Sequence, residues 1–75
     1  MTDIELLKQY IDESGMPKSR IAERSGMTRD RLYTILKGAD AKATEIEMLS
    51  KTLRLTNVMR DRVFFGKKVA DKTTS

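Results

Sequence analysis

The stretch at residues 18–38, KSRIAERSGMTRDRLYTILKG, constrains the fold of this chain more than any other feature. Two short apolar-patterned segments lie on either side of Gly26. In the second segment, Leu32, Ile35 and Leu36 recur at helical spacing. A helix, a tight turn at Gly26 and a second helix would place the apolar residues on one inner face and leave the basic side chains outside.

The residues around the break have the chemistry that such a turn requires. Ala22 is small enough to lie where two helices cross steeply, and Gly26 can take a positive φ without a Cβ clash. Met27 can fill the space under the turn, and the side chain of Thr28 can cap the next helix. Gly38 would end that helix. An ordinary helical hairpin with a basic, solvated face is the simpler interpretation of the same pattern.

The same stretch resembles the helix-turn-helix of the phage repressor and Cro class of DNA-binding proteins. The resemblance lies in Ile21-Ala22, Gly26-Met27-Thr28-Arg29, Leu32-Tyr33, Ile35 and Gly38. Two residues depart from the pattern: Ser25 stands where the family usually has an apolar residue, and Lys18 where a glutamine often opens the first motif helix. The resemblance implies a lambda-repressor-like, all-α bundle whose second motif helix enters the major groove of DNA.

Apolar periodicity and capping signals predict about five short helices around one core. We expect helices at 2–14, 17–25 and 28–37, a fourth that begins at Thr44, and a fifth that runs from Thr56 or Asn57 to Phe65. Thr2 with Glu5, and Thr44 with Glu47, have the T-x-x-E spacing of a capping box. The DNA-binding domain is expected at 1–66, with a polar tail at 67–75.

Length and composition narrow the function. A chain of 75 residues forms one domain, and this one has no cysteine and no histidine. No arrangement of a nucleophile with a base is recognisable, so we expect neither an enzyme nor a cofactor or metal site. No apolar run approaches the roughly 20 residues that cross a membrane. The acidic N-terminus is unlike a signal peptide, so we expect a cytoplasmic protein.

The charge is distributed unevenly, although the net charge is only +4. Residues 1–16 carry one basic group against four acidic ones, whereas residues 17–38 carry six against two, and residues 39–75 carry eight against five. A basic central segment beside an acidic helix suggests one face for an anionic polymer and another turned away from it. Charge alone does not separate nucleic acid from other acidic partners.

Matching the family's pattern residue by residue implies where the bases would be read. The positions are Arg29, Asp30 and Thr34, with Arg31 and Tyr33 beside them. Arg29 can make a bidentate contact with guanine N7 and O6, and Thr34 could touch a thymine methyl group or a polar base edge. Asp30 could accept from a cytosine amino group, or could only orient Arg29 or Arg31.

Contacts with the DNA backbone are expected from both ends of the motif. They would come from Lys18, Ser19, Lys37, Lys42 and Thr44. The N-terminus of the second helix, with Lys18 and Ser19, is suited to bind an anion. Lys37, Lys42 and the expected cap at Thr44 would contact the opposite strand.

The fifth helix carries more apolar side chains than one buried stripe requires. Val63, Phe64 and Phe65 could form a weak homodimer that is completed on a palindromic operator. Alternatively, both phenylalanines could pack back onto the first helix near Tyr10 and Ile4.

The leading hypothesis is a sequence-specific, double-stranded DNA-binding transcriptional regulator, namely a small Cro-like phage or prophage repressor. An antitoxin or restriction-modification controller could use the same motif. A protein-interaction module, which binds a partner through the apolar end near Phe64 and Phe65, is the alternative from a different class. Specific binding to a short duplex in about 150 mM salt would favour the regulator. Tight binding to a protein that blocks DNA would favour the module.

Overall fold

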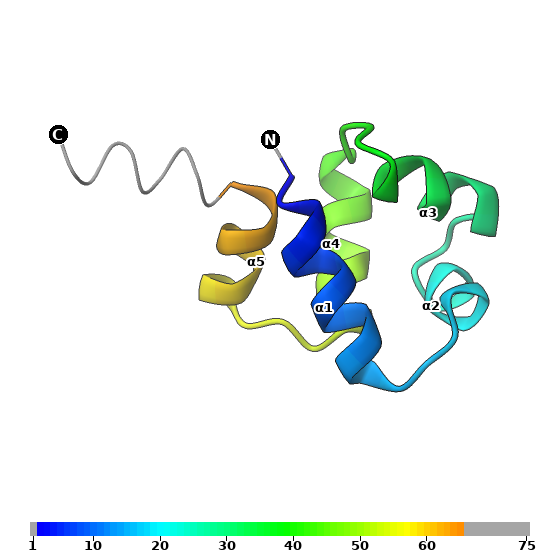
Figure 1. Ribbon diagram of the computed structural model, residues 1–75, viewed down its shortest axis with the longest axis horizontal. Coiled ribbons are helices and arrows are strands. Elements are labelled where there is room, and N and C mark those ends of the chain that lie inside the picture. Colours follow the sequence, from blue (N-terminus) through cyan, green and yellow to red (C-terminus); the bar gives the residue numbers. More distant parts are fainter. Residues whose placement is uncertain (1, 66–75) are drawn as a thin grey trace, which may run out of the picture.

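The computed structural model describes residues 2–65, which form five helices (Figure 1). They are α1 (Ile4–Ser14), α2 (Lys18–Arg24), α3 (Arg29–Leu36), α4 (Ala43–Thr52) and α5 (Asn57–Phe64). No strand occurs between residues 2 and 65. The prediction of an all-α bundle of five short helices is confirmed. The expected domain end at residue 66 and the tail at 67–75 lie outside the described residues.

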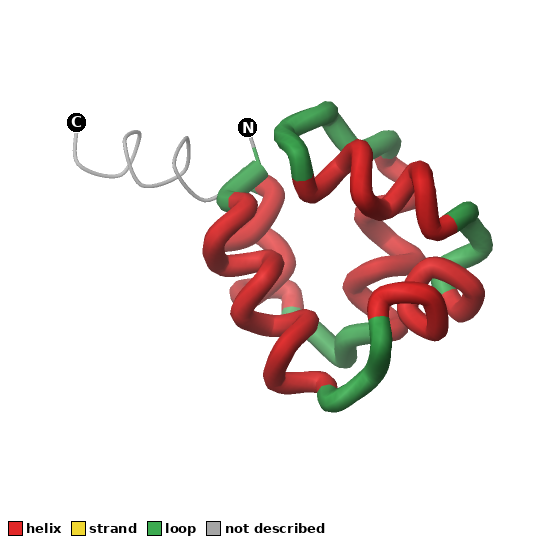
Figure 2. Tube along the Cα trace, turned by 45° about the vertical axis from the view of Figure 1, so that its right-hand side comes forward, coloured by secondary structure: helices red, strands yellow, loops and turns green. Residues whose placement is uncertain are grey.

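Every helix contributes side chains to one apolar core. The buried members are Leu7, Ile11, Ile21, Ala22, Leu32, Ile35, Leu36, Leu49, Val63 and Phe64. α1 packs against α3 and α5, and α2 packs against α3 and α4. In the ribbon of Figure 1 and in the turned Cα trace of Figure 2, α5 lies at the opposite end of the molecule from α2. The arrangement leaves one side of α2 and α3 open to solvent.

The connection from α2 to α3 has the geometry that the sequence predicts. Gly26 has a φ of +74°, a conformation that costs little only for glycine. The N–H of Met27 donates to the carbonyl of Ala22 at 3.0 Å, which closes the turn. Thr28 caps α3, because its Oγ1 accepts from the N–H of Arg31 at 3.0 Å. The predicted roles of Gly26 and Thr28 are confirmed.

Ser25 is buried although its side chain is polar. Its exposed fraction is 4%, and its Oγ donates to Oγ1 of Thr52 in α4 at 3.1 Å. A buried hydroxyl group that keeps a hydrogen-bond partner avoids most of the penalty of leaving water. The polar residue therefore joins the end of α2 to α4 and does not disrupt the core.

The capping box expected at Thr2 is wrong. α1 begins at Ile4, and its cap is Asp3, whose Oδ1 accepts from the N–H of Leu6 at 3.1 Å. Aspartate is at least as good an N-cap as threonine, and its negative charge also suits the positive end of a helix. The helix therefore starts one residue later than the T-x-x-E spacing of Thr2 and Glu5 indicates.

The capping box expected at Thr44 is also wrong. α4 begins at Ala43, and Lys42 occupies the cap position. Oε1 of Glu45 accepts from the N–H of Lys42 at 2.8 Å, so an acidic side chain inside the first turn satisfies this terminus. Thr44 is instead an exposed residue within the first turn.

The dimer contact expected from Val63 and Phe64 is wrong, because α5 buries both side chains. Val63 and Phe64 have exposed fractions of 0% and 3%, so neither can contact a second copy. Phe65 is 40% exposed, so the alternative in which both phenylalanines pack inward is wrong as well. Thr56 caps this helix by accepting from the N–H of Met59 at 3.1 Å. Val63 and Phe64 therefore belong to the core, and Phe65 remains at the surface.

Candidate nucleic-acid interface

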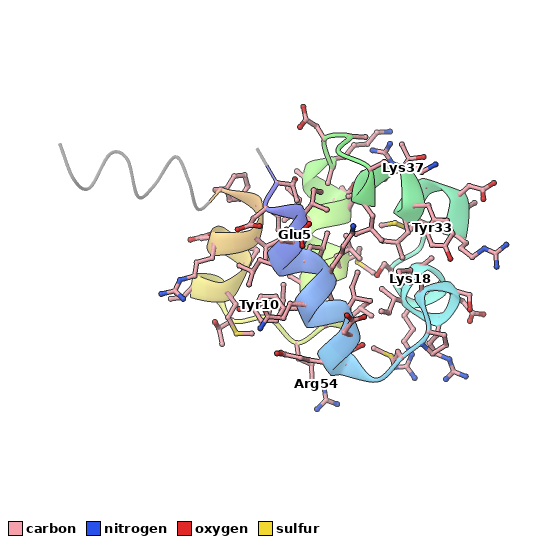
Figure 3. All side chains as sticks on the ribbon, viewed as in Figure 1. Glu5, Tyr10, Lys18, Tyr33, Lys37 and Arg54 are labelled. Carbon is pink, nitrogen blue, oxygen red and sulfur yellow. The ribbon has the colours of Figure 1, made fainter. Side chains whose placement is uncertain are left out.

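The side chains of α3 divide into an inner and an outer face. Leu32, Ile35 and Leu36 are buried. The outer residues are Arg29, Asp30, Tyr33, Thr34 and Lys37, all of them exposed. These positions recur at i, i+1, i+4, i+5 and i+8, which forms one stripe along a helix. We call this set the outer stripe of α3. In Figure 3, Lys37, Tyr33 and Lys18 follow one another across the end of the molecule that α3 and α2 form.

Arg29 and Tyr33 contact each other within the outer stripe. Cζ of Arg29 lies 5.9 Å from the centroid of the Tyr33 ring, in the geometry of a cation–π contact. The two side chains are neighbours because residues four apart share a helix face. Neither of the ion pairs within residues 2–65 involves Arg29. The ring therefore restrains the guanidinium group and leaves its N–H groups available for a planar acceptor such as a guanine edge.

Arg31 is engaged within the protein. Its Nε lies 2.7 Å from Oε2 of Glu45, and its Nη2 donates to Oε1 of Glu45 at 2.9 Å and to the carbonyl of Asp40 at 3.1 Å. The hydrogen bond from Arg31 lowers the pKa of Glu45 from 4.5 to about 2, and the same bond raises the pKa of Arg31. Arg31, expected beside the base-reading positions, could reach a base only by losing these contacts.

Asp30 and Thr34 are linked through the backbone. Oγ1 of Thr34 donates to the carbonyl of Asp30 at 2.9 Å. The carboxylate of Asp30 forms no ion pair with Arg29 or Arg31, since the pairs within residues 2–65 are Arg31–Glu45 and Arg60–Asp61. The alternative in which Asp30 orients a neighbouring arginine is therefore unsupported, and its carboxylate remains at the surface.

Of the five residues expected at the DNA backbone, Lys37 is the last member of the outer stripe, and the other four lie on neighbouring segments. Lys18 and Ser19 open α2, Lys37 follows the end of α3, and Lys42 and Thr44 flank the start of α4. Lys18 is half-buried, and the other four are exposed. The hydrogen bond from Arg31 to Asp40 and that from Lys42 to Glu45 hold the loop at 38–42. Lys37 and Lys42 are thus presented from the two ends of a braced loop.

Glu45 is the residue of this region that sequence reasoning missed. Its partner Arg31 is 14 residues away along the chain, and no local spacing rule connects them. The one available signal was an acidic residue in the first turn of a helix, which indicates capping and not an ion pair. The structure adds Glu45 as the group that holds α3, the loop and α4 together.

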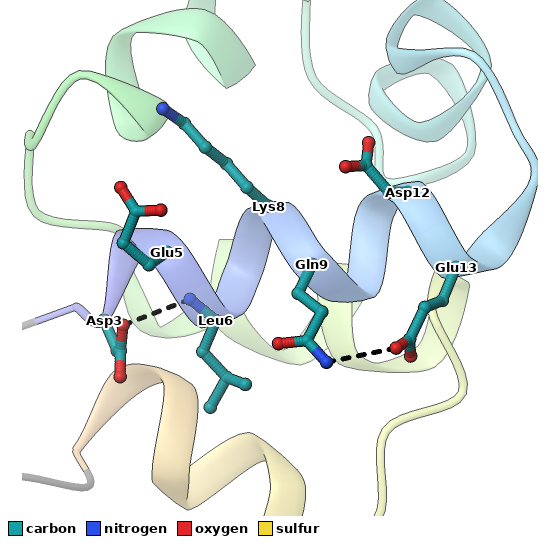
Figure 4. A pocket seen from close by; sticks show the side chains of 7 residues that line it. All are labelled: Asp3, Glu5, Leu6, Lys8, Gln9, Asp12 and Glu13. Atoms are coloured by element: carbon teal, nitrogen blue, oxygen red, sulfur yellow. Dashed lines mark hydrogen bonds between the residues drawn. The ribbon is translucent and has the colours of Figure 1, made fainter.

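The outer side of α1 is acidic. Figure 4 shows the shallow pocket along this helix, which is lined by Asp3, Glu5, Leu6, Lys8, Gln9, Asp12 and Glu13. Four carboxylates against one lysine repel a phosphate chain, so an anionic polymer would avoid this side. In the described part of the chain, no group of three or more His, Cys, Asp or Glu side chains could hold a metal ion. No helix among these residues is both long and apolar enough to cross a membrane.

Comparisons with protein-family models, with curated proteins and with solved structures found no match. The assignment of a function therefore depends on the chemistry of α2, α3 and the loop that follows.

Proposed function

We propose that the chain is a sequence-specific, double-stranded DNA-binding transcriptional regulator in which α2 and α3 act as a helix-turn-helix. The proposed class is a small Cro-like phage or prophage repressor that works in the cytoplasm. The observation that supports it is the outer stripe of α3: an exposed helix face with hydrogen-bonding side chains above a fully apolar inner face. Such a helix fits a major groove about 12 Å wide, which displays a distinct pattern for each base pair.

In the proposed complex, α3 enters the major groove and α2 lies across the backbone. Arg29, restrained by Tyr33, reads a guanine. Lys18 and Ser19 contact phosphates on one side of the groove. Lys37, Lys42 and Thr44 contact phosphates on the other side, and the acidic side chains of α1 take no part in the contact. Repression then follows from occupation of an operator that the polymerase needs.

We further propose that two copies bind two half-sites one helical turn apart on a palindromic operator. One recognition helix reads few base pairs, and paired modules multiply both affinity and specificity. Phe65 and Val58 are exposed apolar side chains of the α5 region, with exposed fractions of 40% and 63%. Two such residues make only a small contact, so pairing would be weak in free protein and completed on DNA.

Selection of bound sequences from a random duplex pool in about 150 mM salt tests the proposal. We expect one short sequence to be enriched, and we expect the protein to bind it far more tightly than a scrambled duplex of equal length. Equal affinity for the two duplexes would reject a sequence-specific regulator. Absence of duplex binding, together with capture of a protein partner through Phe65, would support the interaction module.

A further inference from the structure

The hydroxyl group of Thr34 is already used inside the helix. Its Oγ1 donates to the carbonyl of Asp30 at 2.9 Å, one turn earlier in α3. A threonine hydroxyl has a single hydrogen, so this group has no proton left to donate to a base. The bond also turns the oxygen toward the preceding turn of the helix backbone.

The methyl group of Thr34 then occupies a different staggered position on the same Cβ. Thr34 is exposed on the outer stripe, and its methyl group, unlike its hydroxyl hydrogen, is not engaged within the helix and can contact an incoming ligand. Its neighbours on the stripe are charged or carry a phenol group: Arg29, Asp30, Tyr33 and Lys37. Thr34 therefore supplies a small apolar contact within an otherwise polar reading face.

Among the four bases, thymine alone presents a methyl group in the major groove. From this match we infer that the γ-methyl group of Thr34 contacts the 5-methyl group of one thymine in each half-site. The inference rests on the proposed function, because it needs α3 to lie in the major groove. Of the two roles considered for Thr34, we favour the methyl contact, because the hydroxyl group cannot donate to a base edge while it donates to the carbonyl of Asp30.

Two variants separate the methyl group from the hydroxyl group. Thr34→Val keeps the branched shape and the methyl group but removes the hydroxyl, whereas Thr34→Ser keeps the hydroxyl and removes the methyl. Both changes lie at an exposed position, and thermal unfolding followed by circular dichroism will show that each variant is folded. The ligand is the duplex enriched from the random pool, in which each thymine is replaced in turn by uracil, which lacks the methyl group.

We expect one thymine per half-site at which uracil weakens binding of the wild-type protein by about fourfold, the factor that burial of one methyl group supplies. Thr34→Val should bind the thymine duplex as the wild type does and should remain sensitive to uracil. Thr34→Ser should bind the thymine duplex less tightly than the wild type does. Replacement of the thymine by uracil should not weaken the binding of Thr34→Ser any further.

Three results would overturn the inference and leave the proposed function intact. They are a specific duplex in which no uracil replacement matters, a loss of affinity in Thr34→Val as large as that in Thr34→Ser, and uracil sensitivity that persists in Thr34→Ser. Failure to enrich any duplex would instead overturn the proposed function, and the thymine contact with it.

Discussion

Nε of Arg31 in α3 lies 2.7 Å from Oε2 of Glu45 in the first turn of α4. The other carboxylate oxygen of Glu45 accepts from Nη2 of Arg31 and from the N–H of Lys42. The Glu45 side chain is only 14% exposed, so water screens this bidentate pair less than a pair at the open surface. One carboxylate thereby holds together α3, the loop at 38–42 and α4.

The pair makes stability depend on acidity. The folded protein lowers the pKa of Glu45 from 4.5 to about 2. The stabilisation is fully present above pH 4.5 and is lost as the pH falls toward 2, because the unfolded chain takes up the proton first. We expect Glu45→Gln to be less stable than the wild type at pH 7, and we expect the difference to shrink below pH 4.5.

Urea unfolding at a series of pH values measures this effect. Glu47→Gln is the matched control, since Glu47 is exposed in the same helix and belongs to neither ion pair within residues 2–65. Equal dependence of stability on pH in the wild type and Glu45→Gln would show that the pair does not stabilise the fold.

Removal of the Arg29 side chain should affect specificity. We expect Arg29→Ala to cost about 1–3 kcal/mol of specific binding and to relax the preference at one base pair. Arg62→Ala is the control, because Arg62 is an exposed arginine of α5, at the other end of the molecule (Figure 1). Competition between the enriched and scrambled duplexes measures the affinity and the specificity of each variant. An equal loss of affinity for the two duplexes would indicate that Arg29 contacts the DNA backbone and not a base.

Lysines that contact phosphates should strengthen binding to every duplex, whatever its base sequence. Lys18→Ala and Lys37→Ala should each weaken binding to every duplex similarly and reduce the slope of log affinity against log salt by about one unit. Lys8→Ala, on the acidic side of α1, should leave the slope unchanged. An unaltered slope in Lys18→Ala or Lys37→Ala would place that lysine away from the DNA.

Ala22 tests the packing of α2. Its side chain is buried in the core, and α2 packs against both α3 and α4. We expect Ala22→Leu to destabilise the fold by roughly 1–3 kcal/mol through overpacking. Ala43→Leu adds the same volume at an exposed position and should have little effect. An unfolding midpoint in urea equal to that of the wild type would contradict this prediction, because it would show that the helices leave room for a larger side chain at residue 22.

Phe65 is the residue on which to test pairing. We expect the free protein to sediment as a monomer or a weak dimer, and we expect two copies to load on a duplex that contains both half-sites. Phe65→Asp should bind a single half-site normally but should load the second copy less tightly. Sedimentation that shows one copy per full duplex for the wild type would reject pairing and leave single-site DNA binding intact.

The sequence by itself determined the local elements of this protein. The apolar spacing of Leu32, Ile35 and Leu36 predicted which face of α3 is buried, and all three are core residues. Gly26 and Thr28 predicted the turn and the cap that follows it, and both have the expected geometry. These features are predictable because each depends on a residue's own conformational preferences and on neighbours within about one helical turn.

Tertiary structure decided the contacts between distant residues. Ser25 donates a hydrogen bond to Thr52, 27 residues away along the chain, and Arg31 donates to Glu45, 14 residues away. Packing also selected which apolar residue of the last helix stays outside, since the core accommodates Val63 and Phe64 and leaves Phe65 exposed. Helical periodicity does not contain this information: it places residues on a face, whereas the partner of that face depends on how the helices come together.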